Sequence, residues 1–177
     1  MMLGRSVPIV LLVSLAVFAV ALVGVSGGHP ATGQPKVAAL STSDRCTPVG
    51  GMLMTNFGGI DQTTTMGTAT GDLAGAVAGT VLGTPGPGVG GTIVFHVQHH
   101  WVTQSGDTLF FDPATATTLP LSQTLFAILS YPIHLTGGTG RFNGAAGDLI
   151  AIGEVDLSSG TVFRYSGKVC FADPDSH

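Results

Sequence analysis

From Cys46 onward the sequence consists of short runs in which apolar and polar residues alternate, and turn-forming residues separate the runs. Alternation with a period of two is typical of half-buried β-strands, and no long amphipathic helix pattern is present. Strands are predicted at Gly51–Phe57, Thr63–Thr70, Ala74–Leu82, Gly91–Thr103, Thr108–Asp112, Ser130–Thr136, Asp148–Val155 and Thr161–Phe171. This spacing favours an antiparallel barrel or sandwich, and about eight strands close a small barrel with room for side chains or one ligand.

Two segments between the predicted strands lack this alternation. Residues 113–129, PATATTLPLSQTLFAIL, are expected to form a long connection with room for a short helix. Residues 82–90, LGTPGPGVG, are rich in glycine and proline and predict a flexible loop.

The first 28 residues have the pattern of an export signal, because Arg5 precedes an uncharged apolar run from Val7 to Val25. The run is nearly long enough to span a bilayer, so an uncleaved anchor is the alternative to a cleaved signal. Residues 29–45 read as a linker, 46–171 as the folded β-barrel unit and 172–177 as a C-terminal tail. We therefore expect a secreted or extracytoplasmic protein that meets a membrane only through its N-terminal segment, if that segment is retained.

The two cysteines, Cys46 and Cys170, lie at opposite ends of the predicted folded unit. An exported protein with an even number of cysteines most simply pairs them, and there is no C-x-x-C motif. A bridge that closes a loop of about 124 residues would stabilise the fold by about 5 kcal/mol in the chain-entropy model. A structural disulfide is predicted.

Charge is sparse: 9% of the residues are charged and the net charge is −4. The basic residues after Arg5 form no cluster; they are Lys36, Arg45, Arg141, Arg164 and Lys168. A nucleic-acid partner needs a surface that neutralises phosphates, so nucleic-acid binding is not expected.

The stretch LTGGTGRFNGAAGDL, residues 135–149, is unusually dense in glycine. A phosphate-binding loop would need a helix directly after the glycines, but a strand pattern follows. The sequence instead predicts a tight reversal at 137–140, and then a strand whose small residues at 144–147 suit a bend or a close backbone approach.

The same stretch resembles the barrel family that includes plant dirigent proteins and allene oxide cyclases. The matching residues are Gly137, Gly138, Thr139, Gly140, Arg141, Phe142, Ala145 and Gly147. The resemblance implies an all-β, calycin-like, eight-stranded antiparallel barrel with a central pocket, often in an oligomer. Members of this group steer reactive hydrophobic intermediates through coupling or cyclisation, largely by shape. The chain also resembles small exported bacterial proteins of unassigned activity.

The densest polar cluster is IVFHVQHHWVT, residues 93–103. On a strand, one face would carry His96, Gln98 and His100, and the other Phe95, Val97, His99 and Trp101. If the second face lines the interior, His99 beside an aromatic wall is a candidate general acid or base. The alternative is a plain barrel strand with a wet outer face. Histidines at i and i+4 on one strand face lie about 13 Å apart, so no metal site is predicted.

Glu154 is the only glutamate in the chain and the second candidate catalytic group. It shares a strand face with Ile150 and Ile152, which is compatible either with a buried acid at a pocket mouth or with a strand-end surface charge. The candidate ligand-binding residues are Phe95, Trp101, Tyr131, His134 and Tyr165. Arg164 and Tyr165 face opposite sides of one strand, so at most one of them lines a pocket.

Two functions remain open from the sequence. One is a barrel that binds a hydrophobic small molecule and steers its cyclisation or isomerisation, with His99 and Glu154 as acid–base groups. The other is a non-catalytic exported carrier or a structural or interaction module. No cofactor and no metal ion is expected, a homo-oligomer is compatible with the resemblance, and a metal-dependent cupin-like enzyme fails on ligand spacing.

Overall fold

The computed structural model describes residues 45–171; the predicted export segment, nearly all of the predicted linker and the predicted C-terminal tail lie outside the described residues. The strands are β1 Arg45–Asn56, β2 Thr64–Ala69, β3 Gly75–Val81, β4 Gly86–Pro87, β5 Ile93–Thr103, β6 Thr108–Phe111, β7 Ala114–Pro120, β8 Leu125–Ser130, β9 Pro132–Gly138, β10 Ala146–Asp156 and β11 Gly160–Phe171. Three single 3₁₀ turns join them: η1 Gly71–Leu73, η2 Val89–Gly91 and η3 Gly140–Phe142.

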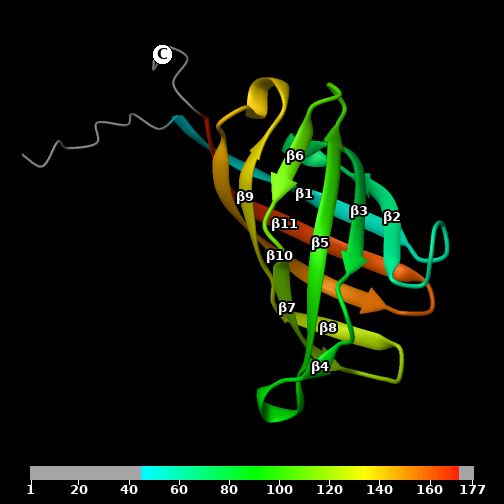
Figure 1. The fold of residues 1–177 in the computed structure, drawn as a ribbon. Helices are drawn as coiled ribbons and strands as arrows, with labels where there is room; N and C mark the ends of the chain where they lie inside the picture. Colours follow the sequence, from blue (N-terminus) through cyan, green and yellow to red (C-terminus); the bar gives the residue numbers. More distant parts are fainter. Residues whose placement is uncertain (1–44, 172–177) are drawn as a thin grey trace, which may run out of the picture. The chain divides into compact units, whose positions relative to one another are not determined.

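The strands form one antiparallel sheet that closes on itself (Figure 1). Around the ring the order is β1, β2, β3, β5, β6, β9, β10 and β11, and β11 pairs with β1 along the whole length of both strands. Closure leaves no long free edge and creates an inside and an outside for every strand. The prediction of an all-β, eight-stranded antiparallel barrel is confirmed.

Two positions of the ring are occupied by strands that are broken in the middle. The long strand β5 pairs with β6 near Trp101 and with β7 near Val97. On the far side, β10 pairs with β9 near its start and with β8 near its end. The breaks fall at residues 112–113 and at Tyr131, so β6 with β7 and β8 with β9 each act as one bent wall strand.

The expected long connection at residues 113–129 is wrong, because these residues form the β7–β8 hairpin. The alternation in β7 was masked because its inward residues are small or polar: Ala114, Ala116 and Thr118 are all buried. Residues 82–90, expected to be a flexible loop, include β4, which pairs with β5.

The barrel has two different ends. At the end that carries the cysteines, called here the cystine end, η1 and η3 fold over the opening and bury Leu73 and Phe142. A reversal follows the glycines, but not at the predicted residues 137–140: β9 continues to Gly138, η3 follows, and β10 begins only at Ala146, so Gly144 lies in the connection and not in the strand. The other end, called the loop end, carries the β1–β2, β3–β5, β7–β8 and β10–β11 connections.

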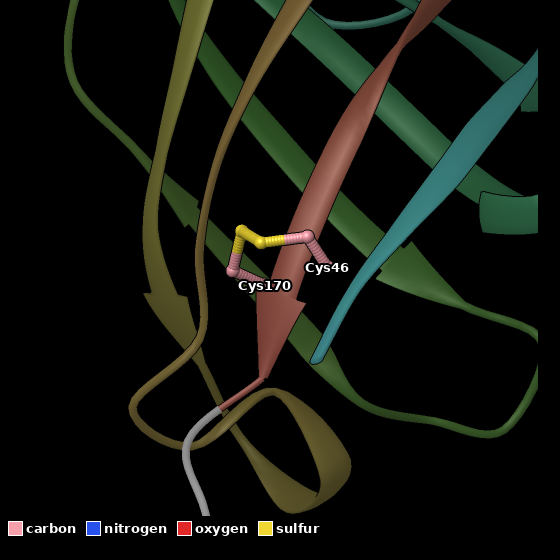
Figure 2. The surroundings of a disulfide bond; sticks show 2 residues. All are labelled: Cys46 and Cys170. Carbon is pink, nitrogen blue, oxygen red and sulfur yellow. A yellow bond between two sulfur atoms is a disulfide. The ribbon is translucent and has the colours of Figure 1, made fainter. Parts of the chain in front are cut away.

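Cys46 and Cys170 form a disulfide at the cystine end (Figure 2). The two residues lie directly opposite each other in the pairing of β1 with β11, so the predicted bridge joins neighbouring strands. It fixes the two strands that close the ring and lie farthest apart in the described sequence, since the cysteines have a sequence separation of 124.

Candidate functional site

The interior of the barrel contains a cavity of about 60 Å³ toward the loop end. The residues around it are aliphatic, aromatic or threonine, together with Gly79, His99, Tyr131 and His100, although the His100 side chain is exposed on the outer face of β5; no carboxylate, lysine or arginine lines the cavity. An apolar enclosure of this kind accepts an apolar molecule more readily than water, because water needs polar partners.

Small residues on the inward face leave this space open. Gly79 of β3 points no side chain into the barrel, and Ala116 of β7 contributes only a methyl group. A Cβ built on Gly79 would lie 3.4 Å from Cγ1 of Val97 and 3.5 Å from the hydroxyl of Thr65, which is ordinary contact. The cavity therefore follows from which residues face inward rather than from an irregular backbone.

The cavity spans several layers of inward residues. Its deepest layer, toward the cystine end, includes Trp101 of β5, and it reaches the loops at Phe57 and Leu157. Leu157 is 42% exposed, so the lining of the cavity reaches the protein surface at the loop end. The opposite end is closed by buried Leu73 and Phe142.

The main polar feature of the cavity is a hydrogen-bonded pair, His99 and Tyr131. The hydroxyl of Tyr131 lies 2.8 Å from Nε2 of His99. The break between β8 and β9 places Tyr131 here, and the imidazole also packs edge-on against Phe111 with ring centroids 5.8 Å apart. His99 is partly exposed as a whole residue, but its Nδ1 is buried and has no hydrogen-bond partner.

Both members of the pair are uncharged near neutral pH. Burial lowers the pKa of His99 to about 4, with a smaller contribution from neighbouring His100. Burial likewise raises the pKa of the Tyr131 phenol above its ordinary value. The pair can exchange hydrogen bonds with a ligand, but it brings no formal charge into the cavity.

The buried threonine hydroxyls of the cavity have partners of their own. Thr55 and Thr161 bond each other at 2.7 Å. Thr118 donates to the carbonyl of Ile93 at 2.9 Å, and Thr65 donates more weakly to the carbonyl of Gly79 at 3.4 Å. Among the buried side-chain nitrogen and oxygen atoms of residues 45–171, only Nδ1 of His99 lacks a partner.

Four of the residues proposed from the sequence meet in this cavity: Phe95, His99, Trp101 and Tyr131. The face of β5 that carries Phe95, Val97, His99 and Trp101 points inward, while His96 and His100 are exposed on the other face. Trp101 donates its indole N–H to the carbonyl of Leu73 at 2.8 Å, which ties the cavity wall to the cap at the cystine end.

Tyr165 is buried but does not line the cavity. Its ring packs edge-on against Trp101, with centroids 5.4 Å apart, on the side toward the cystine end. Its hydroxyl donates to the carbonyl of Thr70 at 2.8 Å and accepts the N–H of Leu73 at 3.1 Å. Its position is that of a structural tie between β11 and η1, whereas Arg164 on the same strand faces outward.

Two sequence-proposed residues lie on the outer surface and correct the expectation of a shared pocket. Glu154 is exposed and borders a separate depression outside the barrel. Its neighbours Ile150 and Ile152 are themselves 58% and 54% exposed, so the apolar face that suggested burial points outward. His134 is also exposed, and its Nδ1 lies 2.8 Å from Oδ1 of Asp148 on the neighbouring strand.

Sequence reasoning missed Gly79 and Phe163, which also shape the cavity. Phe163 packs edge-on against Tyr131 with centroids 5.7 Å apart. Alternation along 161–171 could have identified it, since Phe163 and Tyr165 share a face. Gly79 gives no such signal, because a glycine in a strand is ordinarily attributed to the backbone.

No three histidine, cysteine, aspartate or glutamate side chains among residues 45–171 gather closely enough to bind a metal ion. Within the same range, no helix has the length and apolar character needed to cross a bilayer.

No protein-family model and no curated protein matches the chain. Among solved structures, the chain is similar to a pterocarpan synthase dirigent protein, with a TM-score of 0.34 and 15% sequence identity over 80% of this chain and 98% of that chain. This similarity is too low to transfer an activity or a residue role, and the barrel described above rests on the strand pairings of the chain itself.

Proposed function

We propose that the barrel binds an apolar small molecule in its interior and that the molecule enters from the loop end. The observation that carries this proposal is the cavity lined by aliphatic and aromatic side chains without any formally charged residue. Burying an apolar ligand there removes its surface from water at no cost in unpaired charge. The cavity is small, so the ligand, or the part of it that inserts, is small as well.

Trp101 provides a direct test, because it is the only tryptophan of the chain and lines the cavity. Iodobenzene is a suitable probe, since a bound heavy atom beside the indole quenches its fluorescence. Saturable quenching in the wild type, lost when Gly79→Leu fills the cavity, would support binding inside the barrel. Quenching that is linear in probe concentration, or equal in both proteins, would contradict it.

A more specific form of this proposal is that the barrel also steers a reaction of the molecule that it binds. A reactive apolar molecule held in the cavity would cyclise or isomerise along a path restricted by the walls, with His99 and Tyr131 as the available hydrogen-bonding groups. The acid–base pair expected from the sequence is not supported, because Glu154 lies outside the cavity. A carrier that binds its ligand unchanged needs the same cavity, and product analysis after incubation with a reactive ligand separates the two.

Export is part of the proposal and is supported by the disulfide. Structural disulfides persist in oxidising compartments, and Cys46 is bonded to Cys170. We propose a secreted or extracytoplasmic location, with the N-terminal segment either removed or kept as an anchor. Mass spectrometry of the N-terminus of the protein from its native cells would decide between a cut and a retained segment.

Self-association is a second candidate function, favoured by an outer apolar patch on contiguous strands. Its members are large apolar side chains that are 40% to 58% exposed: Met52, Met54, Met66, Leu129, Ile150, Ile152 and Val162. They lie on β2, β1, β11, β10 and β8, and in this order each strand pairs with the next. Exposed apolar area of this kind marks interaction surfaces, and methionine adapts easily to a partner.

The occupant that this patch fits is a second copy of the chain. Arg164 lies opposite Ile152 of the patch and Glu154 opposite Val162, and neither charged residue forms an ion pair within the described residues. In a twofold contact the base of each copy can meet the acid of the other. Sedimentation velocity should show a dimer or larger assembly that Ile152→Lys dissociates, whereas Val102→Lys, on exposed β5 surface elsewhere, leaves it intact. A monomer at all concentrations would overturn this candidate.

A further inference from the structure

We propose that His99 is a recognition group for a carbonyl oxygen, so that the cavity selects apolar ketones, aldehydes or esters over hydrocarbons of the same shape. The inference rests on the proposed function, because it concerns the polar group of the molecule that the cavity binds. It starts from the unpartnered Nδ1 of His99 and from the hydroxyl that holds Nε2.

The hydrogen-bond pattern determines which ring nitrogen carries the proton. If Nε2–H donated to Tyr131, the phenol hydrogen would have no acceptor and Nδ1 would be an unused acceptor, because the described residues give neither group another partner. If the phenol donates to Nε2, the phenol hydrogen is satisfied and the imidazole proton lies on Nδ1. The second arrangement leaves fewer groups unsatisfied, so Nδ1–H is a buried donor without an acceptor.

A buried donor without an acceptor is rare in folded proteins, and a ligand or a trapped water usually supplies the missing partner. The cavity beside His99 is open because Gly79, the residue directly opposite it on β3, has no side chain. The walls around the imidazole are aromatic, with Phe111 and Tyr131 packed against the ring. An apolar body with one polar atom fits these surroundings.

The kind of ligand group that accepts the hydrogen bond from Nδ1–H follows from the charged and hydrogen-bonding groups that the cavity lacks. A carboxylate would enter a cavity without lysine or arginine and would be buried as an unpaired charge. A hydroxyl could accept from Nδ1–H but would bring a hydrogen that needs an acceptor of its own. A carbonyl oxygen accepts and brings no donor, so it satisfies His99 without creating a new unpaired group.

The test uses two probes of nearly identical shape, acetophenone and α-methylstyrene, which differ by a carbonyl oxygen in place of a methylene group. Their dissociation constants are measured by NMR titration of the full folded protein. The comparison variant is His99→Phe combined with Tyr131→Phe, which removes both partners of the hydrogen bond while keeping aromatic side chains in place. The ratio between the two affinities should shift by about tenfold toward α-methylstyrene in the double variant.

A second variant assigns the effect to one residue. Tyr131→Phe alone keeps the imidazole, so it should retain most of the wild-type preference for acetophenone. Long-range proton–nitrogen spectra of the histidine ring should place the proton on Nδ1 in the wild type and show that nitrogen shifting when acetophenone binds.

The outcomes separate this inference from the proposed function. If neither probe binds to the wild type, the apolar-ligand function fails and the inference fails with it. If both probes bind and the double variant leaves their affinity ratio unchanged, the cavity binds apolar molecules but His99 does not recognise a carbonyl. Loss of the preference in Tyr131→Phe alone would assign recognition to the phenol and overturn the role of His99.

Discussion

Gly79 lies directly opposite His99 in the antiparallel pairing of β3 with β5. A strand pair that places a glycine beside an inward imidazole opens space where two side chains would otherwise meet. The backbone of Gly79 is in ordinary extended geometry, so the position tolerates a side chain and the space beside His99 can be filled by substitution.

We predict that Gly79→Ala leaves the fold intact and changes the free energy of unfolding by less than about 1 kcal/mol, because its Cβ would make only ordinary contacts. Gly79→Leu should weaken iodobenzene binding by more than about tenfold, because the longer side chain occupies the cavity. Both quantities are accessible from urea unfolding and from quenching of Trp101.

Gly59→Leu is the matched control for that pair, since Gly59 is exposed in the β1–β2 connection and the nearest atom to its Cβ would be Sδ of Met66, at 3.7 Å. The same leucine there should leave iodobenzene binding unchanged. Equal loss of binding in both leucine variants would mean that the probe does not report on the barrel interior.

Buried His99 predicts a dependence of stability on pH. Its pKa is about 4 in the folded protein against an ordinary value of 6.5, so the unfolded chain takes up a proton first as the pH falls. The free energy of unfolding should therefore decrease from about pH 6.5 down to about pH 4, by at most about 3 kcal/mol, and His99 should contribute no further slope below that. Urea unfolding at a series of pH values measures the slope.

The slope should flatten in His99→Gln and persist in His96→Gln, because His96 is exposed on the outer face of the same strand. Asp61 and Asp156 also have lowered pKa values, from hydrogen bonds to Thr63 and Ser158 respectively. The stability they contribute is lost mainly as the pH falls below 3.8, so they do not account for the upper part of the window, toward pH 6.5. A slope that survives His99→Gln would assign it to another group.

The disulfide prediction concerns the closure of the ring. Loss of the Cys46–Cys170 bond, by reduction or by replacing both cysteines with serine, should lower the free energy of unfolding by up to about 5 kcal/mol, since the bond closes a loop of 124 residues. The reduced wild type and the double serine variant should unfold at the same denaturant concentration. An unchanged transition would show that the twelve residue pairs between β1 and β11 hold the closure alone.

The sequence was informative where inward residues are large and alternate strictly, and uninformative where they are small. Strand β5 alternates strictly, and the sequence divides it into two faces, one of which carries Phe95, His99 and Trp101. The structure shows that this face is the inward one. In β7 the inward residues are alanine and threonine, which resemble a loop in composition, so the hairpin was missed. Even strict alternation does not show which face of a strand is inside. Ile150 and Ile152 are apolar yet exposed, so the interpretation of Glu154 as a buried acid on their face is wrong.

The pairing of His99 with Tyr131 could not be predicted for a different reason. His99 lies on β5, whereas Tyr131 lies in the break between β8 and β9, and β5 pairs with neither of those strands; the contact depends on that break. Local patterns give the face of each strand but not the bend that brings two side chains together across the interior.

The last prediction separates the two buried tyrosines. Tyr165→Phe should lower the free energy of unfolding by about 1–3 kcal/mol, because the N–H of Leu73 and the carbonyl of Thr70 both lose a buried partner. Iodobenzene affinity should stay within about twofold of wild type, because Tyr165 lies below the cavity and does not line it. Tyr131→Phe is the matched comparison, since it removes the same hydroxyl from a residue that lines the cavity. If Tyr165→Phe impaired iodobenzene binding without changing stability, the hydroxyl of Tyr165 would belong to the ligand site. The ligand site would then extend one layer of side chains further toward the cystine end.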